Sequence, residues 1–373
     1  MGNNPKPTGK YAVGTTTFTA KELRDEVLHP GEKRRISARI YYPVTKDSVN
    51  GLEKVMYMSR DMFKGVKGAF KLPLNYDKET AAGHNVSECY KDALRITGEK
   101  FPLIIFNHGY QSFREGNSFL CIELASHGYV VMTVGHPLEG VCTEYDGAAP
   151  TFGDKKLLKL ANKPMIPNIL ALNKLCKMKG SDEELTKAID KYQESFGAFL
   201  KKRLPEWKKD IYTALDYAKQ NFSDLIDFDK GIGLTGHSLG GALSYYLCMK
   251  DPQFKCGVNI DGTLFGEYKN QIMDKPFLMI ACDDHEVLTA RVCSMHSAPA
   301  YKALFRDMKH VGFSDMKHAI PKAMSAVAGK LDADLMHENL CRCHIEFFDT
   351  HLKKAKSSPE LKTNDVMRYA VYE

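Results

Sequence analysis

The sequence predicts an α/β fold whose mostly parallel sheet carries helices on both faces. Residues 101–106 and 129–134 are short, continuous apolar runs, which are typical of strands buried on both faces of a parallel sheet. Segments with apolar residues at helical spacing alternate with such runs, as in proteins built from strand–helix units. A chain of 373 residues is long enough for one large core, so we expect residues 1–373 to form a single domain.

The first strands of the chain have a different pattern. Residues 13–19 and 34–42 alternate polar with β-branched or aromatic side chains, and a Pro-Gly turn lies between them. These two segments predict an antiparallel strand pair. Residues 44–99 show no sustained period, so we expect loops and short helices there.

The fourth predicted strand, 129–134, follows a helix predicted over 118–127 that Gly128 terminates. After this strand, residues 136–203 interrupt the alternation of strand and helix. We interpret them as a lid-like insertion within the domain.

The insertion is rich in lysine and contains prolines that exclude one long helix, Pro164 and Pro167. The plain interpretation is a solvated surface loop, and the alternative is a lid that rests on an anionic membrane. Its central part interleaves Lys155, Lys156, Lys159, Lys163, Lys174, Lys177 and Lys179 with Leu157, Leu158, Leu160, Met165, Ile166, Ile169, Leu170 and Leu172.

The last third of the chain returns to alternating elements. Pro205 is expected to start an amphipathic helix that leads into a strand ending near residue 237. A final helix is expected over 334–353, and the polar tail beyond residue 355 is expected to be loosely held. Three further strands are predicted over 256–260, 277–281 and 303–308.

Composition excludes several classes of protein. The net charge of +6 is mild for this length and is not gathered into a basic block, which argues against nucleic acid as a partner. Ten cysteines stand singly, so we expect reduced thiols, and Cys341, Cys343 and His344 have no second cluster to complete a metal site. We therefore predict neither a metal nor another cofactor.

The N-terminal residues are polar, and no apolar run is long enough to span a bilayer. We therefore expect a cytoplasmic protein, with the insertion as its only candidate for peripheral membrane contact. The sequence carries no signal of oligomeric state.

The sequence Gly236-His-Ser-Leu-Gly-Gly241 lies between a predicted strand and a predicted helix. In a nucleophile elbow, a Gly-x-Ser-x-Gly turn holds the serine oxygen clear of the sheet, and the helix that follows directs backbone N–H groups at the reacting centre. Ser238 is therefore the candidate nucleophile. A packing turn with an incidental serine is the alternative, but the flanking strand and helix favour the elbow.

A serine nucleophile needs a histidine base and a carboxylate that orients it. His310 is expected to end the last predicted strand, and we favour it over His318, which lies farther along the loop. The acid is left open by the residues alone, because Asp261 follows one predicted strand and the pair Asp283–Asp284 follows the next.

An oxyanion hole needs two backbone N–H donors, one from the residue after the nucleophile and one from the loop after an early strand. These two positions are occupied by Leu239 and Tyr110. Gly109 would permit the sharp turn that directs the N–H of Tyr110 at the site.

The motifs resemble those of the platelet-activating-factor acetylhydrolase family, from about residue 5 to residue 354 with gaps. The resemblance implies an α/β-hydrolase fold, Asp261 as the triad acid, and Tyr110 and Leu239 as oxyanion donors. The chain departs from the family's pattern at Leu239, where phenylalanine is familiar, and in Gly262-Thr263. The motifs are Phe106-Asn-His-Gly-Tyr-Gln-Ser-Phe-Arg114, Glu123-Leu-Ala-Ser-His-Gly-Tyr-Val130, the elbow, and His310 with Phe313-Ser-Asp315.

The resemblance implies a calcium-independent serine esterase that removes short or oxidised acyl chains from the sn-2 position of phospholipids. Ser238 would attack, His310 would transfer protons and Asp261 would orient His310. The alternative enzyme is a general carboxylesterase acting on small soluble esters. A non-catalytic binding protein of the same fold would have a damaged triad, and none is visible in the sequence.

Overall fold

The computed structural model describes residues 4–163, 165–266, 268 and 270–373. Contacts divide the chain into two compact units, and helix α7 (Ala198–Asn221) runs across the boundary. The predicted single domain, with an insertion over 136–203, stays a prediction. Unit 1 comprises residues 1–154, 209–230 and 314–326, and unit 2 comprises residues 155–208, 231–313 and 327–373.

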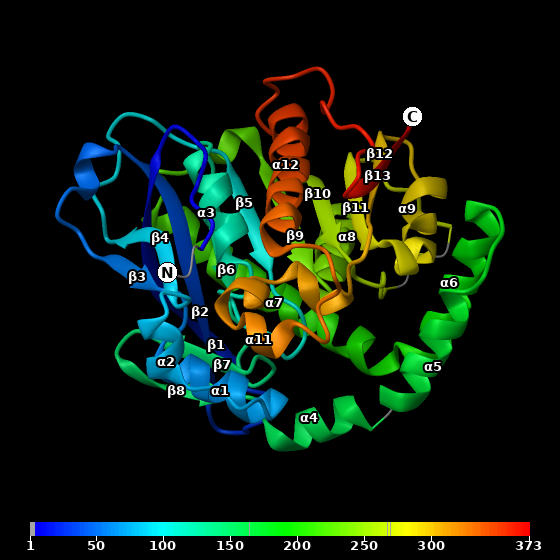
Figure 1. Ribbon diagram of the computed structural model, residues 1–373, viewed down its shortest axis with the longest axis horizontal. Coiled ribbons are helices and arrows are strands. Elements are labelled where there is room, and N and C mark those ends of the chain that lie inside the picture. The colour runs from blue at the N-terminus through cyan, green and yellow to red at the C-terminus, as the bar shows by residue number, and fades with distance from the viewer. Residues whose placement is uncertain (1–3, 164, 267, 269) are drawn as a thin grey trace. The chain divides into compact units, whose positions relative to one another are not determined.

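The sheet of unit 1 has the order β5-β6-β2-β1-β4-β3. The antiparallel pair predicted near the N-terminus is confirmed, because β1 and β2 pair along most of their length (Figure 1). Strand β2 is antiparallel to β6, and β6 is parallel to β5. The strands are β1 (Ala12–Asp25), β2 (Lys33–Val44), β3 (Lys54–Met56), β4 (Val86–Lys91), β5 (Leu103–Asn107) and β6 (Val130–Val134), with a separate hairpin of β7 (Cys142–Tyr145) and β8 (Ala148–Phe152).

Helix α3 (Ser118–Ser126) packs against β2 and β6, and every one of its residues is buried. Gly128 follows it with φ 86, which confirms the predicted termination. The stretch 44–99 contains short helices, as expected, but also β3 and β4, which its lack of period did not reveal. The other short helices of unit 1 are η1 (Asp47–Val49), α1 (Arg60–Phe70), α2 (Tyr76–Ala81), η2 (Phe228–Lys230), α10 (Met316–Ala319) and α11 (Pro321–Met324).

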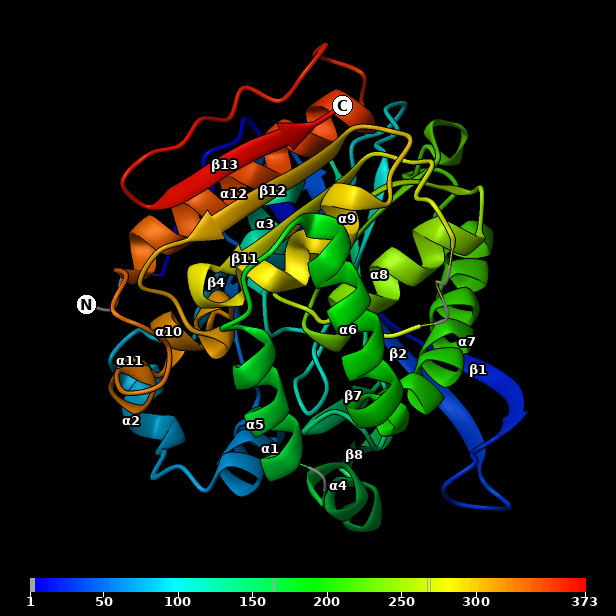
Figure 2. The same cartoon turned by 90° about the vertical axis from the view of Figure 1, so that its right-hand side faces the viewer.

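The sheet of unit 2 has the order β13-β12-β11-β10-β9. Strands β9 to β12 pair in parallel with one another, whereas β13 is antiparallel to β12. The expectation of a loosely held C-terminal tail was wrong, since β13 pairs with the whole of β12 (Figure 2). The strands are β9 (Ile232–His237), β10 (Phe254–Ile260), β11 (Phe277–Cys282), β12 (Ala300–Phe305) and β13 (Met367–Tyr372).

Helices α8 (Leu239–Lys250) and α12 (Ala333–His351) cover the two faces of this sheet (Figure 1). On the face towards α12, Thr235 donates a hydrogen bond to Nε2 of His344 over 3.0 Å. On the other face, a Cβ placed on Gly257 would lie 2.9 Å from Sγ of Cys248 on α8. Both helices therefore approach the sheet closely. The remaining helices of unit 2 are α4 (Lys155–Asn162), α5 (Met165–Leu175), α6 (Asp182–Phe196), η3 (Asp283–Thr289), α9 (Ala290–Ser294) and η4 (His310–Phe313).

Two predicted boundaries were wrong. Strand β12 ends at Phe305, because the chain turns at Asp307, whose φ is 53, and Met308 forms an isolated bridge with Gly329. Helix α7 begins at Ala198, so Pro205 lies inside it and leaves one turn without a backbone hydrogen bond. The residues before Pro205 are good helix formers, which explains the earlier start.

Among the described helices, none combines the length and the apolar character needed to cross a bilayer. All ten cysteines are free thiols, and nine of them are buried. In the insertion, Leu157 and Leu175 are buried while Leu160, Ile166 and Leu170 are exposed. Pro164 and the side chain of Met165 lie outside the described residues.

Candidate active site

Ser238 lies at the turn between β9 and α8, with φ 56 and ψ −121. An L-residue rarely adopts this conformation, which is typical of strained turns at functional sites. The backbone N–H of Ser238 donates to the carbonyl of Ile260 over 2.9 Å. A Cβ on Gly241 would lie 2.2 Å from Oδ1 of Asn259, so this turn needs glycine at that position.

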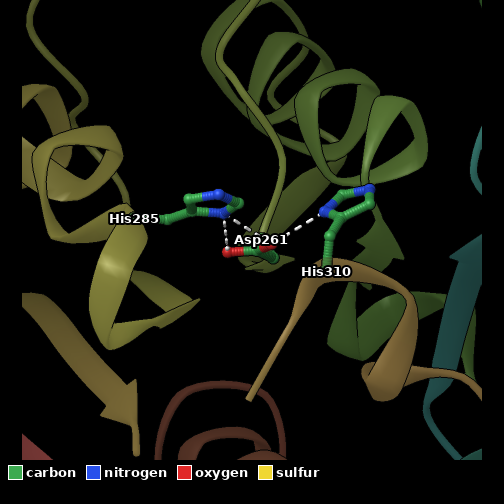
Figure 3. A group of neighbouring side chains, drawn as sticks. All are labelled: Asp261, His285 and His310. Carbon is green, nitrogen blue, oxygen red and sulfur yellow. Dashed lines mark hydrogen bonds and ion pairs between the residues drawn. The ribbon is translucent and has the colours of Figure 1, made fainter. Parts of the chain in front are cut away.

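His310 reaches Ser238 from the first residue of η4. Its Nε2 lies 3.0 Å from Oγ of Ser238. Its Nδ1 lies 2.7 Å from Oδ2 of Asp261, the contact drawn in Figure 3. The nucleophile, the base and the acid predicted from the sequence are thus joined by hydrogen bonds. The boundary shift of β12 places His310 five residues after the strand, in a short helix rather than at the strand end.

Asp261 follows β10 and has a positive φ of 53. Its backbone N–H donates to Ile280, and its Oδ1 accepts the N–H of Cys282 over 3.0 Å. Burial would raise the pKa of this carboxyl, but hydrogen bonds and charge from His285 and His310 hold it well below its usual range. Asp261 is therefore ionised. The competing acid Asp284 is exposed and pairs with Lys309.

The loop after Asp261 packs tightly on the elbow. Asn259 donates from Nδ2 to the carbonyl of Gly262 over 2.9 Å, and its Oδ1 accepts the N–H of Gly262 over 2.8 Å. A Cβ on Gly262 would lie 2.1 Å from the carbonyl oxygen of Ser238. Gly262, one of the three residues that depart from the family's pattern, therefore lets the loop after Asp261 touch the turn at Ser238.

His237 fills the variable position of the elbow and has no role predicted from the sequence. Its Nε2 donates to the carbonyl of His310 over 3.0 Å, and the two rings lie 4.7 Å apart. Burial, and then the charge on His310, lowers the pKa of His237 to about 3. The neutral ring therefore holds the main chain of His310, a contact that no sequence pattern signals.

His285, on η3, is a second residue that the sequence prediction missed. Its Nδ1 lies 3.0 Å and 2.9 Å from the two carboxylate oxygens of Asp261. The only signal in the sequence is its position two residues after Asp283, at the end of a predicted strand.

Asp261, His285 and His310 form a group whose possible ligand atoms lie within 4.8 Å of one another. The nitrogen-to-oxygen separations of 2.7–3.0 Å are those of N–H···O hydrogen bonds, and Nδ1 of His310 makes the contact that a triad requires. The group therefore fits general-base chemistry, and the absence of a metal stays a prediction.

The two predicted oxyanion donors fall in different units. Leu239 is the first residue of α8, where a helix leaves its N–H groups without intrahelical partners. Tyr110 belongs to unit 1, in the loop after β5, where Nδ1 of His108 donates to the carbonyl of Gly109 over 2.7 Å. Their joint action stays a prediction. His318, the base not favoured, lies in unit 1 with its ring edge against Phe119.

Comparison with solved structures supports the same architecture. A ferulic acid esterase from Streptomyces cinnamoneus matches with a TM-score of 0.71 and 21% identity, over 96% of this chain and 95% of that chain. This likeness shows the fold, which is that of the α/β hydrolases, as predicted.

Sequence comparison adds the family. Platelet-activating factor acetylhydrolase of Bos taurus is 24% identical over 379 residues, covering 93% of this chain and 77% of the relative. The protein of the same name from Canis lupus familiaris is 28% identical over 373 residues, with the same coverage of both chains. The family model described as platelet-activating factor acetylhydrolase, isoform II, matches residues 2–364. Since this match spans nearly the whole chain, the protein belongs to the platelet-activating factor acetylhydrolase isoform II family.

Proposed function

We propose that this protein is a serine esterase that hydrolyses short or oxidised sn-2 acyl groups of phospholipids through an acyl-enzyme intermediate. The observation that carries the proposal is the continuous hydrogen-bond chain from Ser238 Oγ through His310 to Asp261. A serine hydroxyl is a weak nucleophile, and this chain supplies the base and the orienting charge that it needs.

In the proposed reaction, Oγ of Ser238 attacks the ester carbonyl while Nε2 of His310 takes its proton. The imidazolium that forms donates its Nδ1–H to ionised Asp261, which stabilises the new charge. The oxyanion accepts the N–H of Leu239 and, as the second predicted donor, that of Tyr110. Collapse releases the lysophospholipid alcohol, protonated by His310, and water then releases the carboxylic acid by the same steps.

The phospholipid substrate rests on the family and on the printed name of the relatives. The competing substrate class is small soluble esters. The structural comparison matches a protein named as a ferulic acid esterase, so the test includes a small soluble ester as well. The departures at Leu239 and Gly262 lie beside Ser238, where the acyl group would bind.

Hydrolysis of phospholipids with graded sn-2 chains, beside nitrophenyl acetate, tests the proposal. We expect the rate to be highest for acetyl or oxidised chains and to fall as the chain lengthens. Turnover of nitrophenyl acetate with no phospholipid hydrolysed would assign the protein to the general carboxylesterases. Failure to hydrolyse any ester or to react with a fluorophosphonate would leave the non-catalytic alternative.

We further propose that helices α4 and α5 rest on an anionic membrane and bring the enzyme to its substrate. Several large apolar side chains of this segment are between 49% and 69% exposed, and exposed apolar side chains that form a patch mark interaction or membrane sites. The lysines around them are exposed as well. Lysine near an anionic surface contributes about 1 kcal/mol, and inserted apolar side chains add to this. The apolar residues are Leu160, Ile166, Ile169 and Leu170.

This membrane contact implies a protein that is peripheral to a membrane while its remaining surface stays in water. A cytoplasmic location fits reduced thiols, since disulfides are rare in that compartment. Both statements are proposals that rest on the surface of unit 2 and on the cysteines, not on the triad.

A further inference from the structure

The carboxylate of Asp261 lies between two imidazole rings. Figure 3 shows His285 on one side of it and His310 on the other, each with Nδ1 directed at the carboxylate. The side chain of Asp261 is wholly buried, while the rings of His285 and His310 are 20% and 38% exposed. Of these two rings, His310 is the one that contacts Oγ of Ser238.

The position of the His285 ring depends on an irregular backbone. Helix η3 is interrupted at His285, where φ is −105 and ψ is 17. The ring reaches both oxygens of Asp261, whereas His310 reaches only Oδ2. Together with Cys282, whose N–H donates to Oδ1 and whose thiol donates to Oδ2, His285 therefore holds the plane of the carboxylate. This plane determines how well Oδ2 accepts from His310.

Resting on the proposed function, we propose that His285 is a positioning residue for the catalytic acid and that its protonation opposes catalysis. Its Nδ1–H holds Asp261 in both charge states of the ring. When Nε2 also carries a proton, the His285 ring is positively charged and faces His310 from the other side of the carboxylate. The centroids of the two rings lie 6.4 Å apart. The transition state requires His310 to become positive, so that charge raises the barrier.

The surroundings of His285 favour its charged form. Burial lowers the pKa of His285, but the hydrogen bond and charge of Asp261 outweigh burial and raise it above its usual value. The charge of Asp284 acts in the same direction and that of Lys309 acts against it. The titratable or charged groups around the ring are Asp261 after β10, Cys282 on β11, Asp284 on η3, and Lys309 and His310 after β12.

The fall in the rate at low pH, which is the acid limb of the pH–rate profile, should therefore reflect the binding of two protons. A single base gives a rate that falls about 10-fold per pH unit, whereas two coupled protonations give up to about 100-fold. We expect the wild-type protein to show the steeper fall.

The test compares His285→Asn with His285→Phe. The Asn amide nitrogen occupies the position of Nδ1 and can still donate to Asp261, but it does not titrate, whereas Phe keeps the ring shape without a donor. We expect His285→Phe to lower kcat about 10- to 100-fold with little change in KM, as for loss of a hydrogen bond to a charged group. His285→Asn should recover most of that loss and should show the shallower acid limb.

The matched control is His296→Asn, on a histidine of the same unit whose Nδ1 donates to Ala298 instead. It should leave the pH profile unchanged. Rates are followed with nitrophenyl acetate and by fluorophosphonate labelling, and melting temperatures show whether each variant is folded. If His285→Phe does not fold, His285→Asn alone still decides the slope of the acid limb.

The outcomes separate this inference from the proposed function. A wild-type protein that neither hydrolyses ester nor labels at Ser238 overturns both. Labelling and turnover with the same acid limb in the wild type and His285→Asn overturn the role of His285 alone. A uniform loss of stability with unchanged kinetics would make His285 a structural residue, which also contradicts the inference.

Discussion

Oγ of Ser238 and Nε2 of His310 lie 3.0 Å apart, although the two residues are 72 positions apart in the sequence. Removal of the hydroxyl in Ser238→Ala should lower turnover by ~10⁴ to 10⁶, because a triad acts as a unit. Covalent labelling by a fluorophosphonate, measured by mass spectrometry, should disappear as well. Labelling that persists in the variant would mean that another serine is the nucleophile.

Asp261→Asn should reduce turnover by about 10⁴, because an amide cannot stabilise the imidazolium and favours the wrong tautomer of the base. Asp284→Asn is the matched control, since Asp284 follows β11 but is exposed and pairs with Lys309. Its effect should be small. Steady-state kinetics on both variants decide between the two acids, and a larger loss in Asp284→Asn would refute Asp261.

Gly262→Ala tests the close packing of the acid loop on the elbow. The added Cβ would lie 2.1 Å from the carbonyl of Ser238 and 2.7 Å from Oδ1 of Asn259, so the backbone must shift. We expect both a lower melting temperature and a loss of turnover. Gly68→Ala, in α1 with nothing within 4 Å of the new Cβ, should instead stabilise the protein by about 0.5–1 kcal/mol. Normal activity in Gly262→Ala would show that the loop adapts.

Acid should destabilise the fold through His344. This ring is buried, its Nδ1 donates to Leu340 and its Nε2 accepts from Thr235, so it is neutral when folded. Burial lowers its pKa to about 4, whereas the unfolded chain binds this proton near pH 6.5. The unfolded state therefore holds more protons between these values, and stability falls as pH drops from 6.5 to 4, by on the order of 3 kcal/mol.

Urea unfolding at several pH values measures this effect. His344→Gln, which does not titrate, should be less stable near neutral pH but should lose less stability on acidification. An equal pH dependence in the variant and the wild type would assign the effect to other groups.

A triple variant should bind less tightly to liposomes that contain phosphatidylserine when it carries Lys155→Glu, Lys156→Glu and Lys159→Glu. Wild-type binding should increase with anionic lipid and decrease with salt, because the attraction is electrostatic. The control carries the same charge change at exposed lysines elsewhere in unit 2, namely Lys255, Lys330 and Lys362. Co-sedimentation that is equal in the two triple variants, or absent in the wild type at low salt, would show that the insertion is an ordinary surface segment.

The sequence predicted the α/β fold and the family because both depend on local patterns. The buried runs at 101–106 and 129–134 and the elbow motif are contiguous, so each can be interpreted alone. Ser238 and His310 could be proposed from their motif and their place after predicted strands, whereas Asp261 was chosen over Asp283 and Asp284 only through the family resemblance. The structure places all three within hydrogen-bonding distance.

Features that depend on distant partners were not predictable. Strand β13 follows a polar stretch, and it is a strand because β12 offers it a free edge. His285 and His237 are ordinary histidines in the sequence. Their contacts arise from an irregular turn in η3 and from the approach of the His310 carbonyl to the elbow.

Ser238 and Asp261 both have positive φ, at 56 and 53, in conformations that cost an L-residue about 1–3 kcal/mol. Replacement of Ser238 by glycine would relieve that cost while removing the hydroxyl that we propose as the nucleophile. At this position, glycine would therefore favour stability of the fold, whereas the proposed hydrolysis requires serine. A library of random variants selected only for yield of folded protein would accumulate glycine at position 238, and only continued demand for turnover would retain the serine.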